Sequence, residues 1–197
     1  MQIALLICLS YLLGSIPFGF LVSKYFKKID IREFGSGNIG ASNIFRVLGF
    51  RYALLVMIGD CLKGFLPLYL ARIMNIEGIG MYPYLLVGLS AIAGHNWSCF
   101  IKFKGGKGIA TTFGVILFLY PKIAIISALI WLILVIILKF ASVGSIIAVL
   151  NMLVLSFVFN TPIEFKYFAI IINIWAIVQH RGNIIRLTQN RENKIIR

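Results

Sequence analysis

The stretch that decides the fold is GIATTFGVILFLYPKIAIISALIWLILVIIL, residues 108–138. Its 31 residues carry one charge, on Lys122, directly after Pro121. One straight helix of that length would measure roughly 46 Å at about 1.5 Å per residue, whereas the apolar layer of a bilayer is about 30 Å thick. We therefore predict two shorter membrane helices, broken at Pro121.

The composition of the whole chain also indicates a membrane protein. Of its 197 residues 60% are hydrophobic and only 13% are charged, and the mean hydropathy is +0.97. A soluble domain is nearer half apolar and about a quarter charged. We predict an all-α, polytopic membrane protein that forms a single domain over residues 1–197. Residues 1–23 have no charge and no A-x-A-like cleavage site, so we expect a retained span.

Counting apolar stretches gives about seven transmembrane helices. The last stretch is only 13 residues long and fits either a short span or an interfacial helix. Counted as a crossing, it completes the set: 1–23, 52–71, 78–101, two within 108–138, 140–163 and 167–179.

The basic residues test this count. The net charge is +13, which in a membrane protein indicates positive-inside loops and an anionic ligand or lipid surface rather than nucleic acid. With seven spans, 15 of the 19 Lys and Arg side chains fall on one face, three fall on the other, and Lys63 lies within a span. The positive-inside rule then puts the C-terminus in the cytoplasm and the N-terminus outside.

A polar, glycine-rich stretch follows the first span: FGSGNIGASNIFRVLG, residues 34–49. Gly35, Gly37 and Gly40 have the spacing G-x-G-x-x-G, and Asp60 follows 20 residues later, as in a dinucleotide-binding turn. Membrane spans on both sides exclude the strand that such a turn requires.

The same stretch can still bind an anion, because Ser36, Gly37, Asn38 and Gly40 can expose successive backbone N–H groups. We expect residues 41–48 to form a short helix that ends at Gly49, with Asn43 and Arg46 on one face. The alternative is a flexible interhelical loop.

A second polar stretch is GHNWSCFIKFKGGKGIATT, residues 94–112. Its core, Lys104-Gly105-Gly106-Lys107-Gly108, is no Walker A motif, because glycine rather than serine or threonine follows the lysine. Two ammonium groups on a glycine backbone at a helix start still suit a phosphate. The alternative is a tight turn with positive-inside lysines. His95 and Asn96 either satisfy the end of a span or line a site.

A third polar stretch is QHRGNIIRL, residues 179–187. His180, Asn183 and Arg186 are spaced by three, so in a helix they share one face, although Gly182 weakens the prediction of a helix. The alternative is a basic tail at the membrane interface.

Two further pairs of polar residues lie in or near predicted spans. Asp60 and Lys63, three apart within one span, are either functional or a structural ion pair. Ser142 and Ser145 are weaker candidates, because serines near helix ends often bond to the backbone. No Cys/His spacing suggests a metal, and we expect no cofactor.

Taken together, SGNIGASNIFRVLG (36–49), GHNWSCFIKFKGGKGIAT (94–111), HRGNIIRL (180–187) and GDCLKG (59–64) resemble the signature regions of a bacterial family. The family is the acyl-phosphate-dependent glycerol-3-phosphate acyltransferases, the PlsY family. The resemblance covers nearly the whole chain and implies seven spans in the cytoplasmic membrane, with the active site on the cytoplasmic face. It implies transfer of an acyl group from acyl phosphate to the 1-hydroxyl of glycerol 3-phosphate, which gives lysophosphatidic acid and phosphate.

The resemblance also implies a site containing Ser36, Arg46, Lys107, His180 and Asn183. We expect Lys107 and Arg46 to hold phosphate oxygens, with polarisation of the carbonyl as a further role for Lys107. Ser36 and the backbone of residues 36–40 add donors, and His180 and Asn183 orient glycerol 3-phosphate. Further phosphate-binding candidates are Gly37, Asn38, Gly40, Asn43, Lys104, Gly105, Gly106, Ser142 and Ser145. The expected partners are both substrates, the lipid bilayer and, transiently, the enzyme that makes acyl phosphate.

The identity of the base stays open. The chain has no H-x-x-x-x-D pair, because Phe100 follows His95 by five residues and Ile185 follows His180 by five. The proton acceptor is then the phosphate of the substrate, which we prefer, or His180 or His95. Two other classes compete with the enzyme: a transporter of organic phosphate and a lipid-binding structural protein. Unlike many transporters, however, the chain shows no matched halves.

Overall fold

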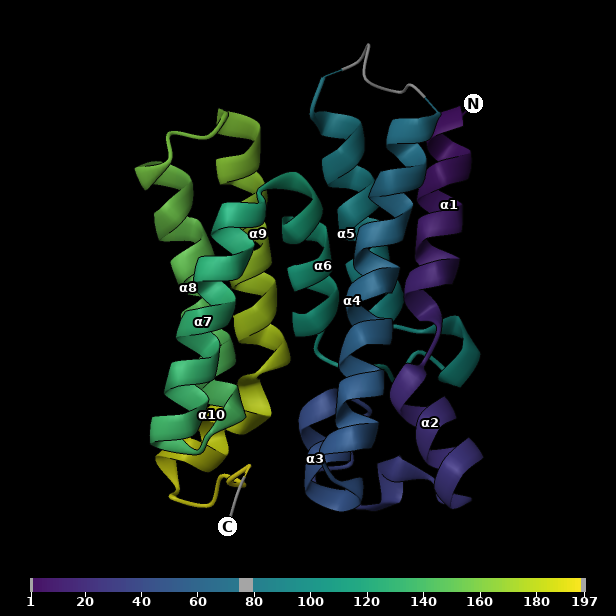
Figure 1. The fold of residues 1–197 in the computed structure, drawn as a ribbon, viewed down its shortest axis with the longest axis vertical. Coiled ribbons are helices and arrows are strands. Elements are labelled where there is room, and N and C mark those ends of the chain that lie inside the picture. Colours follow the sequence, from purple (N-terminus) through teal and green to yellow (C-terminus); the bar gives the residue numbers. More distant parts are fainter. Residues whose placement is uncertain (1, 75–79, 196–197) are drawn as a thin grey trace. The chain divides into compact units, whose positions relative to one another are not determined.

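The computed structural model describes residues 2–74 and 80–195, and in these residues the regular secondary structure is entirely helical. Among the described residues there are two short 3₁₀ turns, η1 (Ile31–Glu33) and η3 (Cys99–Ile101). Its α-helices (Figure 1) are α1 (Gln2–Ser15), α2 (Phe18–Lys27), α3 (Ala41–Leu48), α4 (Phe50–Ile73), α5 (Tyr82–Asn96), α6 (Ile109–Leu119), α7 (Pro121–Leu138), α8 (Ala141–Val158), α9 (Ile163–Gln179) and α10 (Arg181–Thr188).

The predicted break at Pro121 is confirmed. Helix α6 ends at Leu119, and α7 begins with Pro121 at its first position, where the missing N–H of proline costs no helical hydrogen bond. The two helices have 11 and 18 residues. Length and composition make α7 a candidate span, whereas α6 is apolar but short.

The other predicted apolar stretches are also helical. By length and composition the described residues contain five candidate spans, or six if the bent pair α9–α10 is one span. Helix α9 begins at Ile163, four residues before the predicted start, and a bend of 57° separates it from α10. The predicted start of the third span at residue 78 lies outside the described residues.

The first predicted span is found as one candidate span, Gln2–Lys27, but its helix is broken between α1 and α2. Pro17 has no N–H to donate and ends the hydrogen-bond ladder of α1. The Ser15 carbonyl accepts a hydrogen bond from Ser98 Oγ, and the Ile16 carbonyl accepts from Lys63 Nζ at 2.7 Å and from the Phe18 N–H at 3.1 Å. Two polar side chains from later segments therefore help to satisfy the carbonyl groups at this break.

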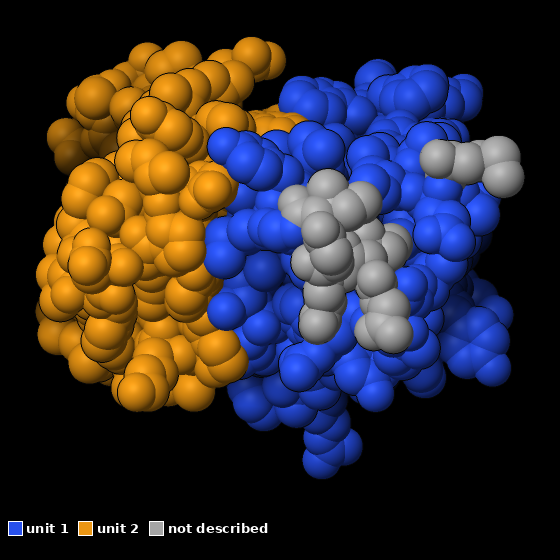
Figure 2. Space-filling view, turned by 90° about the horizontal axis from the view of Figure 1, so that it is seen from above, with its two compact units in different colours: residues 1–119 blue, residues 120–197 orange. Residues whose placement is uncertain are grey.

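The chain forms two compact units, residues 1–119 and 120–197, coloured separately in Figure 2. In the first unit α1 packs on α5 and α4 packs on α6. Glycines make both contacts close: a Cβ on Gly14 would lie 2.2 Å from the Ala91 carbonyl oxygen, and one on Gly114 would lie 2.0 Å from that of Cys61. Small residues of this kind let membrane helices pack backbone against backbone.

In the second unit α8 packs against both α7 and α9. Amide side chains link these helices: Asn151 Nδ2 donates to Ser127 Oγ at 2.9 Å, and Asn173 Nδ2 donates to the Val149 carbonyl at 3.0 Å. Phe165 is fully buried beside the ring of Tyr120. Outward-facing apolar residues such as Ile137, which is 68% exposed, are typical of helices that contact lipid.

Candidate active site

The first unit carries two of the three polar stretches. Residues 34–40 form a loop, and α3 follows from Ala41 to Leu48 and ends at Gly49, as predicted. The loop is held by Asn43, which is buried in the first turn of α3. Its Oδ1 accepts from the Ser36 N–H at 2.8 Å, and its Nδ2 donates to the carbonyls of Phe34 and Asn38 at 3.0 and 2.9 Å.

The expectation that a row of backbone N–H groups in this loop is available to an anion is not met. The N–H groups of Ser36, Gly37 and Gly40 donate within the loop, to Asn43 Oδ1, to the Phe34 carbonyl and to Asn38 Oδ1. A short loop between helices satisfies its own donors because little else can reach them. The loop therefore presents the Ser36 side chain, which is exposed, more than a row of amides.

The loop is fixed to the rest of the first unit by apolar packing. Ile31, Ile39 and Ile44 are almost fully buried in a cluster that includes Val56 of α4. Behind the loop, α2 contributes Gly19, where a Cβ would lie 1.8 Å from the Ile39 carbonyl oxygen. Close approach of helix and loop thus requires glycine here and sets the position of residues 36–40.

The second loop of this unit, residues 102–108, rests on the last turn of α5. Two hydrogen bonds hold it there: Gly105 N–H donates to the Asn96 carbonyl at 3.1 Å, and Gly106 N–H donates to the His95 carbonyl at 3.0 Å. A Cβ on Gly105 would lie 1.9 Å from the His95 carbonyl oxygen. The glycines are therefore needed for contact with α5, and their N–H groups are engaged.

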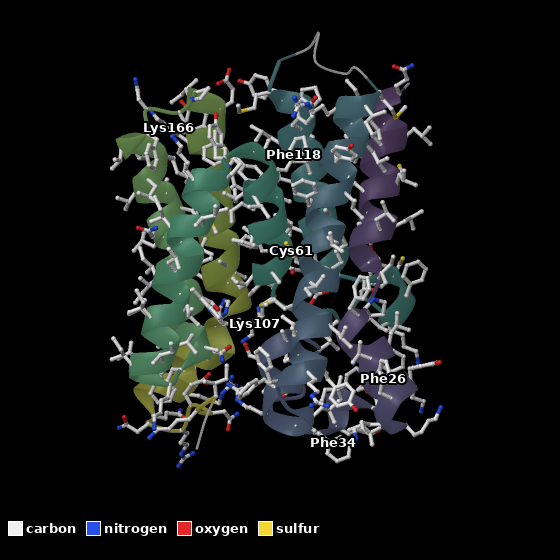
Figure 3. The ribbon with its side chains drawn as sticks, in the orientation of Figure 1. Phe26, Phe34, Cys61, Lys107, Phe118 and Lys166 are labelled. Atoms are coloured by element: carbon white, nitrogen blue, oxygen red, sulfur yellow. The ribbon has the colours of Figure 1, made fainter. Side chains whose placement is uncertain are left out.

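Lys107 follows these glycines directly and is partly buried. Figure 3 shows it in the half of the first unit that also holds Phe34, away from Phe118 at the opposite end. Arg46, on α3, is likewise partly buried. Both cationic side chains thus come from backbone segments that the rest of the unit holds in place, as electrostatic stabilisation of a phosphate requires.

The third polar stretch lies in the second unit, at the junction of α9 and α10. His180 stands at the bend and is 2% exposed. Its Nδ1 lies 2.8 Å from the Ala176 carbonyl oxygen. A carbonyl only accepts hydrogen bonds, so Nδ1 carries the proton and, in the neutral imidazole, Nε2 is the basic nitrogen. Residues 181–188 are helical despite Gly182.

Asn183 and Arg186 of α10 meet at one carboxylate, as their shared face predicts. Glu192 Oε1 accepts from Asn183 Nδ2 at 2.6 Å and from Ser142 Oγ of α8 at 2.9 Å. Glu192 Oε2 accepts from Arg186 Nε at 2.9 Å. The side chain of Glu192 is 2% exposed, and nearby the Ile195 N–H donates to the Lys139 carbonyl at 2.8 Å. The C-terminal segment therefore folds back on α8 and α10.

Sequence reasoning missed Glu192, although a signal exists: it is the one acid after residue 164, in a strongly basic tail. Burial on its own would raise the pKa of this carboxyl. The hydrogen bonds from Asn183, Ser142 and Arg186 outweigh burial and lower the pKa below its ordinary value of 4.5. The carboxylate form is therefore the one that the fold selects at neutral pH.

The two serines of α8 differ. Ser142 points to Glu192, whereas Ser145 Oγ donates to the Ala141 carbonyl at 2.7 Å and accepts from Trp131 Nε1 at 3.2 Å. Ser145 is therefore a serine that bonds to the backbone of its own helix, as expected for serines near helix ends.

Asp60 and Lys63 form the predicted ion pair within α4, with 2.9 Å between Asp60 Oδ1 and Lys63 Nζ. His95 joins them, with its Nδ1 3.5 Å from the same carboxylate oxygen. All three side chains are at most 4% exposed.

Comparison with known proteins identifies the family. Residues 4–190 match the family model described as Glycerol-3-phosphate acyltransferase. The chain belongs to this family. Among its relatives, the glycerol-3-phosphate acyltransferase of Fusobacterium nucleatum is 42% identical over 189 residues, 95% of each chain. That of Aquifex aeolicus is 39% identical over 194 residues, 98% of this chain and 100% of the relative.

Solved structures of the glycerol-3-phosphate acyltransferase family have the same fold. The crystal structure of PlsY (YgiH), an integral membrane glycerol 3-phosphate acyltransferase, in its glycerol 3-phosphate form, matches with a TM-score of 0.92 and 39% identity, over 98% of this chain and 96% of that one. The lysophosphatidic acid form of PlsY matches with a TM-score of 0.90 and 38% identity, over 98% and 95%. The chain is thus an integral membrane member of this acyltransferase family.

Proposed function

We propose that this protein transfers the acyl group of acyl phosphate to the 1-hydroxyl of glycerol 3-phosphate. The products are lysophosphatidic acid and inorganic phosphate, and the reaction is the first acylation step of bacterial phospholipid synthesis. The observation that carries the proposal is the match of nearly the whole chain to PlsY, whose glycerol 3-phosphate and lysophosphatidic acid forms have been solved.

The reaction requires binding sites for two phosphate groups and a base that accepts the hydroxyl proton. The hydroxyl oxygen attacks the acyl carbon, the bond from that carbon to the phosphate oxygen breaks, and the phosphate leaves with the electron pair. Because phosphate is a good leaving group, the enzyme mainly has to hold two anions together and neutralise their charge. Cationic side chains on fixed backbone supply that neutralisation.

We assign the roles accordingly. Lys107 and Arg46 hold phosphate oxygens, Lys104 adds positive charge, and the Ser36 hydroxyl donates to the same anion. Asn43 and the glycine-rich segments, which include Gly37, Asn38, Gly40, Gly105 and Gly106, hold these side chains in place. His180 and Asn183 orient glycerol 3-phosphate, supported by Ser142 through Glu192.

We propose that the substrate phosphate takes the hydroxyl proton. His180 Nε2 is the main protein alternative, because Nδ1 is already bound to the Ala176 carbonyl. His180→Gln separates the two mechanisms: it keeps most of the maximal rate if phosphate is the base. Complete loss of turnover with normal substrate binding would assign the proton to His180.

We further propose seven membrane crossings in one domain, with the N-terminus outside, the C-terminus in the cytoplasm and the three polar stretches on the cytoplasmic face of the inner membrane. The distribution of lysine and arginine supports this orientation. The basic face also suits a transient contact with the enzyme that makes acyl phosphate.

The deciding experiment uses purified protein, acyl phosphate and glycerol 3-phosphate, with release of phosphate and formation of lysophosphatidic acid as readouts. We expect both products in equal amounts. No turnover, together with uptake of glycerol 3-phosphate into vesicles, would replace the enzyme with a transporter.

A further inference from the structure

His95 lies under the loop that carries Lys107. Besides the hydrogen bond from Gly106 N–H to its backbone carbonyl, its ring touches the same glycine: a Cβ on Gly106 would lie 2.2 Å from His95 Nε2. The imidazole therefore fills the space directly beneath Gly106, one residue before Lys107. Any rotation of this ring displaces the loop or opens a gap beneath it.

Asp60 faces the other side of the imidazole ring. Its Oδ1 lies 3.5 Å from His95 Nδ1 and 2.9 Å from Lys63 Nζ, and Lys63 also donates to the Ile16 carbonyl at 2.7 Å. The carboxylate is thus anchored by an ion pair that is itself fixed to the break in the first span. Asp60 Oδ1 and His95 Nδ1 face each other at 3.5 Å without a hydrogen bond, so the carboxylate lies against one nitrogen of the imidazole and the other nitrogen lies toward the loop.

We propose that Asp60 and His95 are a positioning pair, which holds the loop of residues 104–108 and thereby sets the place of the Lys107 ammonium group. Neither side chain touches substrate in this role. The inference rests on the proposed function, in which Lys107 binds a phosphate. It gives the buried Asp60 carboxylate of α4 a role beyond its ion pair with Lys63, because the same oxygen also faces His95 at the end of α5.

Two variants of His95 each remove one of its two contacts, so that the effects of the contacts can be measured separately. His95→Asn keeps an amide near the position of Nδ1, toward Asp60, but leaves nothing beneath Gly106. His95→Gln reaches toward Gly106 but loses the group that faces Asp60. We expect both to lower kcat/KM between about tenfold and a hundredfold, since a displacement of about 1 Å costs on the order of 100-fold. The loss should appear as a raised KM for one of the two phosphorylated substrates.

Gly14→Ala is the matched control, because its Cβ would clash with the Ala91 carbonyl at 2.2 Å, within the helix pair α1–α5 and not against the loop. It should lower the unfolding temperature and leave both KM values unchanged. If the His95 variants behave like this control, with a lower kcat at most, the ring is only part of the packing and the proposal is wrong. Wild-type KM values for His95→Gln alone would remove Asp60 from the role and overturn the pair.

Gly106→Ala tests the same contact from the loop and serves if the His95 variants do not fold. Its methyl group should raise the same KM, and unchanged KM values would refute the proposal. Combined with His95→Asn, whose shorter side chain makes room for the methyl group, it should cost less than the sum of the two single changes. An inactive wild-type protein would instead refute the proposed function.

Discussion

The two units build their polar groups in different ways. In the first unit, glycine allows backbone to lie on backbone: the Ile39 carbonyl on Gly19, and Gly105 on the His95 carbonyl. In the second unit, three side chains from α8 and α10 meet at the carboxylate of Glu192. The first arrangement tolerates no added atoms, and the second tolerates no loss of charge. Substitutions of the packed glycines should therefore act by shape, and substitutions around Glu192 should act by electrostatics.

The largest effect should come from Lys107, the partly buried one of the three lysines in the loop of residues 102–108. Lys107→Ala should lower kcat/KM by about 100- to 1000-fold, as loss of a fixed donor to a developing anion does in other enzymes. Steady-state kinetics with both substrates measures it. Lys102→Asn removes the same charge from an exposed, left-handed position five residues earlier and should have little effect. Equal losses in the two variants would reduce the role of Lys107 to general positive charge.

The second-largest effect on activity should come from placing another negative charge beside Glu192. Asn183→Asp exchanges the donor for a second carboxylate about where Nδ2 now lies, 2.6 Å from Glu192 Oε1. We expect a loss of about 100-fold in kcat/KM and a lower unfolding temperature, because two carboxylates at this distance cannot both ionise. Asn190→Asp is the control, since Asn190 is exposed with a φ of 53° that aspartate tolerates. Nearly normal kinetics for Asn183→Asp would argue against the arrangement around Glu192.

The close packing of the first loop can be tested at Gly35. Its φ is +61° and a Cβ would lie 2.2 Å from Asn43 Oδ1, so Gly35→Ala adds backbone strain of about 1–2 kcal/mol and a clash with the side chain that holds the loop. We expect about a tenfold loss of activity. Gly49→Ala adds strain without a clash, because its φ of +91° and ψ of 179° lie in a region that essentially only glycine adopts and nothing lies within 4 Å of the added atom. If both variants lose only stability, the loop does not position catalytic groups.

A smaller effect, on the stability of the fold, should appear at acidic pH. The pKa of Glu192 is lower in the folded protein than its ordinary value of 4.5, so its contribution to stability is complete above that pH and is lost as the pH falls through the folded value. The difference in unfolding temperature between wild type and Glu192→Gln should therefore be full at pH 7, start to shrink as the pH falls below 4.5 and vanish below the folded pKa of Glu192. A difference that does not change with pH would mean that the charge of Glu192 contributes nothing.

The smallest contrast should be between the serines of α8. Ser142→Ala leaves Glu192 with one donor fewer and should lower activity a few-fold, in keeping with about 1 kcal/mol for one hydrogen bond. Ser145→Ala removes a bond to its own helix and should cost less activity. Steady-state kinetics of both variants would contradict this prediction if Ser145→Ala lost more activity than Ser142→Ala.

Much of the fold follows from local patterns in the sequence. Pro121 separates α6 from α7, and Gly49 ends α3, because each residue restricts its backbone independently of distant contacts. The break at Pro17 carries the same local signal, but residues 1–23 are short enough for one span, so their length did not require a break. At the break the Ser15 carbonyl accepts from Ser98, and the Ile16 carbonyl accepts from Lys63 and from the Phe18 N–H.

The candidate site was predictable in its residues but not in its connections. The polar stretches stand out against apolar spans, so Ser36, Lys107 and His180 could be named. That the loop donors are already engaged, or that Glu192 joins Asn183 to Ser142, depends on contacts between segments up to 50 residues apart. Such contacts leave no periodic signal in a single sequence.

The break at Pro17 also has a consequence for biogenesis. The carbonyl groups of Ser15 and Ile16 find their side-chain partners 83 and 47 residues later in the chain. When the ribosome first delivers α1 and α2 to the bilayer, neither side-chain partner has been synthesised, although the Ile16 carbonyl can already accept from the Phe18 N–H. An unsatisfied carbonyl in lipid costs several kcal/mol, so we expect the Ser15 carbonyl to reach its final environment only after the segment that follows α5 has been inserted.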